Sequence, residues 1–319
     1  MGADLTFPTI KEHLAGTFAP DGKAQPFYGL ELLRFVCAFT IVWGHMHAPF
    51  AIIGYAGLDA FIILSVALST RSSLRHPFGT FLYRRVIRIL IPWLVWCGFY
   101  LALRGLTQGP ASVFALSDPN WLLIGPVIHL WFLPFLMLSS PFTFLATHLP
   151  HGRIFGAAMI VTLVPLCCFG LYLERTMALP EPYLQWAFSF PSLAYAVMRA
   201  SGRAISPVLI IAGICGGMCA LGHAQPALFL ALAALAFELA LRAKWVGSWA
   251  KFLGDTAFGI YLMHPFCVMV LTRVIDLETQ RLTLTFAVFA MSFVGSVILG
   301  WMIAQISRWG SALFKQPSQ

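Results

Sequence analysis

The sequence predicts an all-α integral membrane protein in which about ten transmembrane helices form a single irregular bundle. Apolar residue types make up 59% of the 319 residues, charged types make up only 10%, and the mean hydropathy is +0.82. A soluble domain has about 25% charged residues, so this chain has too few to cover a surface that faces water. The formal net charge of +8 does not indicate nucleic-acid binding, because the basic residues lie at the ends of apolar runs.

Ten apolar runs are long enough to cross a bilayer, which requires a helix of about 20 mostly apolar residues. The predicted spans are 28–48, 53–70, 86–103, 121–146, 154–173, 184–200, 205–222, 226–242, 256–274 and 282–306. Prolines inside them are Pro92, Pro134, Pro141, Pro191 and Pro265. Such kinks persist in lipid where neighbours satisfy the freed carbonyls, so we expect an irregular bundle around a cavity.

The distribution of lysine and arginine predicts the orientation of the chain. With ten spans, sixteen of the 20 Lys and Arg residues lie on the side of both termini and four lie on the other side. The positive-inside rule therefore places both termini in the cytoplasm. We expect a cytoplasmic N-terminal segment at 1–27, with no signal peptide, a transmembrane domain at 28–306 and a cytoplasmic tail at 307–319.

The seven cysteines lie in or at the edges of apolar runs, and neither their odd number nor their spacing indicates disulfide bonds. Cys215 and Cys219 are one helical turn apart, beside Gly213, Gly216 and Gly217. This pattern favours close helix packing at that point over a metal site.

The first predicted span contains Arg34 and His45, and an ionisable residue inside a span indicates function by default. Eleven residues make almost three helical turns, so the two side chains share one face, about 16 Å apart along the axis. Glu31 lies one turn before Arg34 and is placed to pair with it. The alternative is an arginine that extends toward the headgroups and a histidine that is packed against a carbonyl group.

Asp59 follows a tight turn, and we expect it near the outer end of the second span, at the depth of His45. A carboxylate in that place can orient the imidazole and raise its basicity, as for a general base. The alternative is a carboxylate that interacts with the dipole at the start of its own helix. The sequence leaves both interpretations open.

Five arginines fall between Arg71 and Arg88, on the predicted cytoplasmic side. Arg84, Arg85 and Arg88 are expected where the third helix begins. Guanidinium groups offer paired donors to phosphate, and the backbone N–H groups of a helix N-terminus would add to them. The alternative is an anchor that orients the chain and holds anionic lipid.

Four further residues are candidates for a binding pocket, although each is more often a satisfied core residue than a catalytic one. His129 and Trp131 open a kinked helix, and Tyr261 and His264 share a face one turn apart in the ninth span. Ser65, in the second span, is most simply a helix-packing residue.

Five segments taken together resemble the membrane-bound acyltransferase-3 family of bacterial sugar O-acyltransferases. They are Leu33-Arg34 with His45, Gly57–Ser65, Phe81–Pro92, His129–Leu133 and Leu253–Pro265, and in this order they cover the chain from about residue 28 to residue 305. The chain departs from the pattern at Val66-Ala67, where family members usually have a Gly-Phe pair. The departure concerns how closely the helices approach at that point.

The resemblance implies an enzyme that transfers an acyl group, usually acetyl from acetyl-CoA, to a hydroxyl of a glycan or lipid-linked sugar. The implied location is the bacterial inner membrane, and the acceptor class is a cell-surface glycan or exopolysaccharide. The implied partners are acyl-CoA, the sugar acceptor and membrane lipid. No metal ion and no nucleic acid are expected.

In such a reaction the three clustered arginines would bind the phosphates of the donor. Its flexible arm would run past Arg34 and bring the thioester to His45, which would deprotonate the acceptor hydroxyl with Asp59 orienting it. A different class of function is a transporter or flippase for an anionic or lipid-linked glycan substrate, which would use the same buried groups for binding. Transporters often consist of two matching halves, and the sequence contains none.

The charge distribution predicts that residues 71–88 face the cytoplasm and residues 174–183 face outward. A cysteine placed at Thr176, on a cysteine-free background, should react with a membrane-impermeant thiol reagent in intact cells, whereas one at Ser72 should not. The opposite labelling pattern would show that the predicted orientation is inverted.

Overall fold

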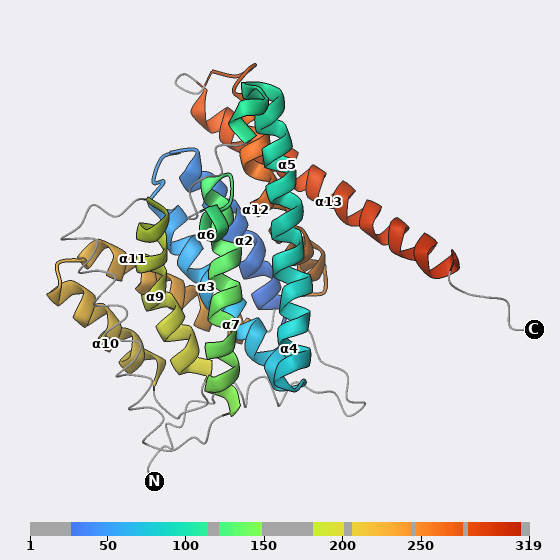
Figure 1. Ribbon diagram of the computed structural model, residues 1–319. Coiled ribbons are helices and arrows are strands. Elements are labelled where there is room, and N and C mark those ends of the chain that lie inside the picture. Colours follow the sequence, from blue (N-terminus) through green and yellow to red (C-terminus); the bar gives the residue numbers. More distant parts are fainter. Residues whose placement is uncertain are drawn as a thin grey trace, which may run out of the picture. The chain divides into compact units, whose positions relative to one another are not determined.

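The computed structural model describes residues 27–113, 121–148, 181–200, 206–243, 246–276 and 280–313 (Figure 1). Within these ranges the regular structure is helical, and no strand occurs. The chain divides into two compact units. Among the described residues, unit 1 comprises the described parts of 59–237, and unit 2 comprises 27–58 with the described parts of 238–313.

Unit 2 is built around helix α12, which packs against both α2 and α13. The apolar faces of these three helices share one core, formed by Ala38, Val42, Met46, Ala257, Ile260, Cys267, Leu284 and Val288. The elements of unit 2 are α2 (Tyr28–His45), the first turns of α3 (Ile53–Ser73), the end of α11 (Ala224–Arg242), α12 (Trp249–Leu271) and α13 (Arg281–Leu313).

The connection between α2 and α3 is short and brings the two helices into close approach. A Cβ atom at Gly54 would lie 2.7 Å from the Cα of Gly44 and 2.9 Å from the backbone oxygen of Thr40. Only glycine fits where two backbones approach this closely. His47 and Phe50, in the connection itself, have φ values of 49° and 59°, in the left-handed region that residues with a side chain rarely adopt.

Unit 1 contains the rest of α3 and a series of helices that pack around α7 (Phe132–His148). Two contacts align α3 with α7: the rings of Phe61 and Phe132 lie 5.2 Å apart, and the hydroxyls of Ser73 and Thr147 lie 2.8 Å apart. Because early residues meet early residues and late residues meet late ones, the two helices run parallel. On its other side α7 packs against α9 (Glu181–Ala200), beside which it lies in Figure 1.

The helix that contains the third predicted span is continuous over 31 residues, Phe78–Gln108, and has one wide turn. It consists of α4 (Phe78–Arg85), the π-helical turn η1 (Val86–Leu90) and α5 (Ile91–Gln108) (Figure 1). Pro92 explains the wide turn, because proline has no N–H and its ring would clash with the carbonyl four residues earlier. The N–H of Ile91 accordingly donates to Val86, five residues back.

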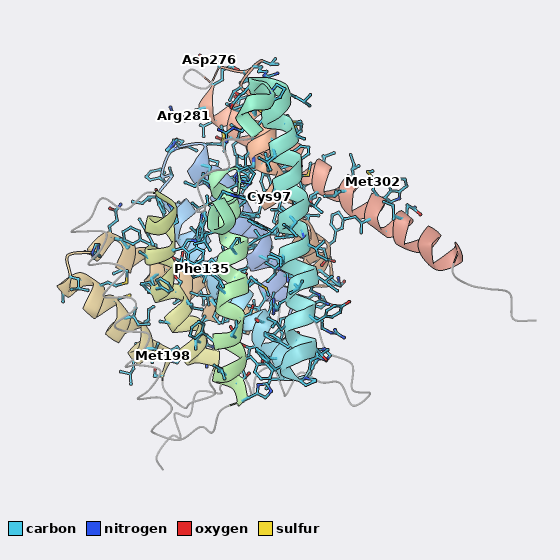
Figure 2. The ribbon with its side chains drawn as sticks, viewed as in Figure 1. Cys97, Phe135, Met198, Asp276, Arg281 and Met302 are labelled. Carbon is cyan, nitrogen blue, oxygen red and sulfur yellow. The ribbon has the colours of Figure 1, made fainter. Side chains whose placement is uncertain are left out.

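The other elements of unit 1 are shorter or lie at its edge. They are η2 (Pro110–Val113), α6 (Trp121–Ile124), η3 (Ile128–Trp131), α10 (Pro207–Ala220) and the first part of α11. The aromatic core of the unit includes Phe135 (labelled in Figure 2), whose ring contacts Trp131, Trp186 and Phe190.

In the part of the chain that the structure describes, six helices are long and apolar enough to cross a membrane. They begin at Ile53, Phe78, Ile128, Ala224, Trp249 and Arg281. The predicted spans at 28–48, 184–200 and 205–222 coincide with α2, α9 and α10, of which the first two are more polar and the last is only 14 residues long. The predicted span at 154–173 lies outside the described residues.

The prediction of close packing around Cys215 and Cys219 holds at Cys215, whose Sγ lies 3.3 Å from the backbone oxygen of Ala227 in α11. The three glycines of α10 beside it do not take part in this contact. A Cβ atom at any of the three would meet no described atom within 4 Å, and Cys219 is exposed. The glycines that do allow close contacts lie in unit 2. The presence of glycine in an apolar helix does not by itself show that another helix packs against it. Five of the seven cysteines are described, and all five are free thiols.

Replacing Gly54 by alanine should destabilise the protein by about 1–3 kcal/mol, because two backbones must separate to admit the methyl group. The matched control is Gly98→Ala in α5, where a Cβ would meet no described atom within 4 Å and alanine should stabilise the helix by up to about 1 kcal/mol. Thermal unfolding of the purified variants in one detergent measures both. Equal midpoints for the two variants would contradict the close approach.

Candidate functional site

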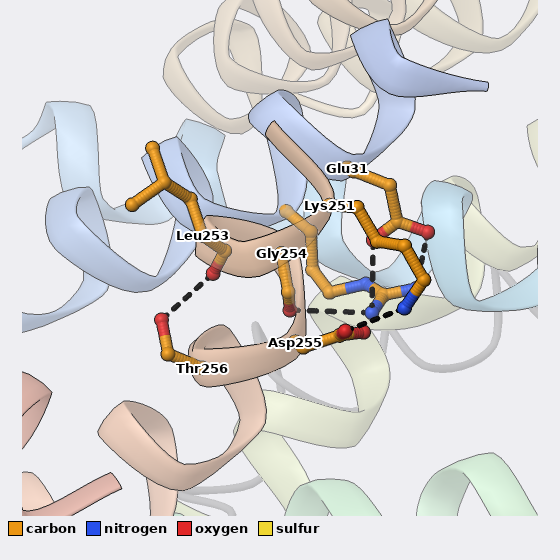
Figure 3. A network of polar contacts seen from close by, with 7 residues as sticks. Glu31, Lys251, Leu253, Gly254, Asp255 and Thr256 are labelled. Atoms are coloured by element: carbon orange, nitrogen blue, oxygen red, sulfur yellow. Dashed lines mark hydrogen bonds and ion pairs between the residues drawn. The ribbon is translucent and has the colours of Figure 1, made fainter. Parts of the chain in front are cut away.

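A hydrogen bond from Arg34, which is also ion-paired within its own helix, joins the first turns of α2 to the first turns of α12. The guanidinium of Arg34 donates from Nη1 to the backbone oxygen of Gly254, 3.2 Å away, and forms an ion pair with Glu31 at 3.1 Å. Figure 3 shows Glu31 and Gly254 facing each other across this contact. The pairing of Glu31 with Arg34 is as predicted, and the bond to Gly254 attaches the arginine to the neighbouring helix.

A second contact joins the later turns of the same two helices. The imidazole rings of His45 and His264 lie 5.1 Å apart, with their planes inclined by 30°. Arg34 and His45 are eleven residues apart on α2, and their partners Gly254 and His264 are ten apart on α12. The helices therefore run parallel and in register, and both Arg34 and His45 face α12.

The hydrogen bonding of His264 defines which of its nitrogens carries the proton. Nδ1 lies 2.7 Å from the backbone oxygen of Tyr261, and because a carbonyl oxygen only accepts, Nδ1 carries a hydrogen. In a neutral ring Nε2 is then a hydrogen-bond acceptor. His264 is 2% exposed and Tyr261 is also 2% exposed, whereas His45 is exposed. One imidazole is thus accessible, and a buried one lies against it.

The connection that follows His45 is held at two points. The indole Nε1 of Trp43 donates to the oxygen of Pro49 at 2.8 Å, and Arg281, at the start of α13 (Figure 2), donates to the oxygen of His47 at 3.1 Å. His47 has one of the two left-handed backbone conformations. Strained residues persist where the surrounding structure holds them, and they cluster at functional sites.

Lys251 and Asp255 form a further ion pair at 2.6 Å near the Arg34 end of α12 (Figure 3). Their side chains are 59% and 56% exposed, so the pair contributes little to stability.

The basic cluster lies in unit 1, and its geometry corrects one prediction. The helix begins at Phe78, so Arg84, Arg85 and Arg88 lie in its second and later turns rather than at its start. The backbone N–H groups there are inside the helix and do not face an anion. The cluster therefore offers side-chain donors only.

The three arginines of the cluster differ in exposure. Arg84 and Arg88 are exposed, whereas Arg85 is half-buried with its guanidinium 5.4 Å from the ring centre of Phe81. Partial removal of His76 from water, together with the positive charges of Arg84, Arg75 and Arg88, lowers the pKa of this histidine. The guanidinium groups of Arg75, Arg84, Arg85 and Arg88 thus lie in one region of unit 1.

Asp59 lies in unit 1 and accepts a hydrogen bond of 2.7 Å from the hydroxyl of Ser192 in α9. It is the seventh residue of α3, beyond the first turn in which the helix dipole acts most strongly, so the dipole interpretation is not favoured. The predicted action of Asp59 on His45 stays a prediction.

His129 and Trp131, in η3, are each 4% exposed and belong to the core of unit 1. The ring of His129 packs edge-on against Tyr100 at 5.3 Å. Tyr261 and His264, the other two pocket candidates, lie in unit 2. The structure therefore divides the four candidates between the two units, and in unit 2 it joins His264 both to Tyr261 and to His45.

Sequence reasoning missed a group of hydroxyls that lines a cleft beside Arg85. The group consists of Ser65, Ser69, Ser139, Ser140 and Thr143. A signal was present, because Ser65 with Ser69, and Ser139 or Ser140 with Thr143, have the three- or four-residue spacing of one helix face. The sequence analysis interprets Ser65 alone of this group, as a packing residue.

Within the described residues, no three His, Cys, Asp or Glu side chains come close enough together to hold a metal ion.

These features define a class: a multi-pass membrane protein with ionisable side chains inside apolar helices. The family profile described as an acyltransferase domain matches residues 27–303, and the chain belongs to this acyltransferase-3 family. It is therefore a membrane acyltransferase, as the resemblance in its sequence implies. The match covers almost all of the predicted transmembrane domain. Neither the curated proteins nor the solved structures contain a significant match.

The position of His76 gives a test of the basic cluster. Its pKa should lie below the ordinary value of about 6.5 in the free protein and should rise when 3′,5′-ADP binds, because the anion offsets the neighbouring positive charges. Binding then takes up protons, so the affinity for 3′,5′-ADP should increase as the pH falls through the bound and then the free pKa. Histidine-selective NMR titration measures both pKa values, with His148 as the control. An unchanged His76 pKa at saturating ligand would contradict anion binding at the cluster.

Proposed function

We propose that this membrane acyltransferase transfers an acetyl group from cytoplasmic acetyl-CoA to a hydroxyl of a cell-surface glycan, exopolysaccharide or lipid-linked sugar at the bacterial inner membrane. The observation that carries the proposal is the register of α2 and α12. It aligns a fixed guanidinium at one end of the helix pair with an accessible imidazole at the other. A long acyl donor needs one group that binds it at a distance from its thioester and another group that reacts at the thioester. Arg34 and His45, at opposite ends of the helix pair, are separated in this way.

The donor phosphates bind the basic cluster of unit 1. Arg84 and Arg88 are exposed, and guanidinium groups form short, charge-assisted hydrogen bonds to phosphate oxygens. The pKa of His76 is lowered first by partial removal from water and then by the charges of Arg84, Arg75 and Arg88. The second contribution supports this assignment, because a bound anion would offset it. The alternative is that the cluster binds anionic lipid headgroups. In that case it should bind anionic membranes more tightly than 3′,5′-ADP, the soluble nucleotide portion of CoA.

His45 acts as the general base. Its neutral imidazole accepts the proton of the acceptor hydroxyl while that oxygen attacks the thioester carbonyl carbon. The C–O bond forms, the C–S bond breaks, and the imidazolium returns its proton to the departing CoA thiolate. The products are the O-acetylated sugar and CoA with a free thiol, so no further reactant is required.

His264 positions His45. Its Nδ1–H is occupied by the carbonyl of Tyr261, which holds the ring in one orientation behind the exposed imidazole. A ring held in this way limits the rotation of His45 and offers an acceptor nitrogen in an apolar surrounding. Arg34, bonded to Gly254 and Glu31, serves the donor at the opposite end of the same helix pair.

The proposed topology of ten spans with both termini in the cytoplasm agrees with two parallel helix pairs. Two spans of a multi-pass chain run parallel when an odd number of other spans lies between them. In the ten-span arrangement α2 and α12 are the first and ninth spans, and α3 and α7 are the second and fourth. Both pairs meet this condition.

The test of the function is transfer of labelled acetyl from acetyl-CoA by the purified protein, with loss of the thioester as the readout. His45→Ala should lower turnover by about 10²–10⁴-fold, the usual contribution of a general base, and leave acetyl-CoA affinity close to normal. A variant that retains a third of the wild-type rate would remove His45 from the mechanism. A wild type that moves a glycan without consuming acetyl-CoA would indicate a transporter instead.

The role of His264 is tested by His264→Asn, whose amide can keep the hydrogen bond to the Tyr261 carbonyl but lacks the second ring nitrogen. If His264 positions the base, kcat should fall about tenfold, KM for acetyl-CoA should stay unchanged and the pH profile of kcat should shift. If the residue only supports the fold, the asparagine variant should behave as wild type in all three respects, while His264→Ala loses stability.

A further inference from the structure

A small cleft lies inside unit 1 between α3, the junction of α4 with η1, and α7. Its polar lining consists of Ser65, Ser69, Arg85, Ser139, Ser140 and Thr143. The space in it that is open to the centre of a water molecule is about 10 Å³. A buried water molecule needs about 10–15 Å³ on this scale, together with two to four polar partners. The cleft therefore has room for one water molecule and for no larger ligand.

The hydroxyls of α7 offer only acceptors to this space. Ser139 and Ser140 donate to the oxygen of Leu136 at 3.0 and 2.8 Å, and Thr143 donates to the oxygen of Ser139 at 3.3 Å. A hydroxyl has one hydrogen to donate and two lone pairs that accept. Because their hydrogens are bonded to the backbone, these three groups can only accept from a molecule in the cleft.

The hydroxyl of Ser69, on the α3 side of the cleft, has a hydrogen to donate. It is 4% exposed and has no hydrogen-bond partner among the described residues. Buried polar groups are almost always paired, because an unpaired one loses its bond to water and gains nothing in return. The α7 hydroxyls line the same cleft but are too distant to bond Ser69 directly, and one interposed water molecule bridges such a distance.

The guanidinium of Arg85 adds further donors to the lining. It is half-buried, and its contact among the described residues is with the ring of Phe81, whose centre lies 5.4 Å away. A guanidinium has five N–H groups and no acceptor, and an aromatic ring does not satisfy them. Arg85 therefore also requires an acceptor inside unit 1.

The lining thus has donors on the α3 and α4 sides and acceptors on the α7 side, around the space of one small molecule. A metal cation there would lie beside the positive charge of Arg85, and an anion would meet the lone pairs of three hydroxyls. Water accepts and donates at once. We infer that the cleft binds one water molecule, which accepts hydrogen bonds from Ser69 and Arg85 and donates to the hydroxyls of α7.

The bound water connects three helical segments at one point. Ser65 and Ser69 lie between Phe61 and Ser73, the two residues at which α3 contacts α7. The water joins the same two helices at an intermediate level and attaches Arg85 to both. It thereby holds the one inward arginine of the basic cluster in place, while the other two stay exposed.

Ser69→Ala distinguishes a bound water from an unpaired hydroxyl by the sign of its effect on thermal unfolding in one detergent. With a bound water the variant loses a hydrogen bond, and the midpoint should fall by about 2–4 °C. Without the water the variant only removes an unsatisfied buried group, so the midpoint should rise or stay unchanged. Ser69→Val extends the test, since its methyl groups would stabilise a dry cleft but displace a bound water.

A double-mutant cycle tests the bridge between the two helices. Ser69 and Ser140 are not bonded to each other, so their effects should add unless a shared water couples them. We expect Ser69→Ala/Ser140→Ala to lower the midpoint by less than the sum of the single changes. The matched control is Ser189→Ala in α9, a buried serine outside the cleft that, like Ser140, donates four residues back, and it should combine additively with Ser69→Ala.

A crystal structure that shows ordered water gives the direct test. One peak should lie about 2.7–3.2 Å from the Ser69 hydroxyl, from a nitrogen of Arg85 and from at least one hydroxyl of α7. Crystals soaked in bromide should show no anomalous signal at this point, and a signal would make the cleft an anion site. That result, a peak missing from the cleft, a more stable Ser69→Ala variant or additivity in both cycles would each overturn the inference. None of these measurements uses acyl transfer, so the proposed function is tested separately.

Discussion

The parallel register between α2 and α12 is the constraint on which the candidate site depends. Arg34 holds α12 through the carbonyl of Gly254, and His45 lies against His264 almost three turns later. Because Arg34 donates to a backbone oxygen, its hydrogen bond depends on where the backbone of α12 lies and not on which side chain is present there. Small shifts of one helix along the other would therefore break the arginine contact and separate the imidazoles together.

Helix packing in a membrane offers little hydrophobic discrimination between registers, because lipid is as apolar as the core. Specific polar contacts and close-packed glycines supply the discrimination instead. Unit 2 has both: the Arg34 contact near one end of α2, and the approach of Gly44 and Gly54 near the other. This arrangement explains why a helix with Glu31 and Arg34 inside an apolar protein is still a stable element, since each charge has a partner.

Much of this architecture is predictable from the sequence. The apolar runs locate α3, α5, α11, α12 and α13, because each is long and uninterrupted, and the spacing of Arg34 and His45 predicts their common face. The run predicted as one span at 121–146 is instead broken at residues 125–127, and α6, η3 and α7 share it. The partner of His45 is not predictable in the same way. Tyr261 and His264 are visible as a pair at helical spacing, but which helix they face depends on packing between segments more than 200 residues apart.

Three other features could not be predicted from the sequence: where the third helix begins, the cleft lined by hydroxyls, and the lack of described neighbours at the glycines of α10. The third helix begins eight residues before its apolar run, so the arginines fall inside it rather than at its start. The cleft is lined by serines and a threonine on separate helices, and such residues are common in membrane helices without any ligand. Glycines misled in the opposite direction: those at 213–217 have the spacing of a packing motif and meet no described neighbour.

The wide turn at Val86–Leu90 has a consequence for the arginine cluster. In a regular α-helix, residues three apart project from nearly the same face, but a widened turn rotates the later residue away. Arg85 is thereby turned inward while Arg88 stays outside. Because the widening follows from the missing N–H and the rigid ring of Pro92, it is a covalent property of the chain and exists before any ligand arrives. The different directions of the two side chains are therefore set when the helix folds, because the backbone of this turn determines them.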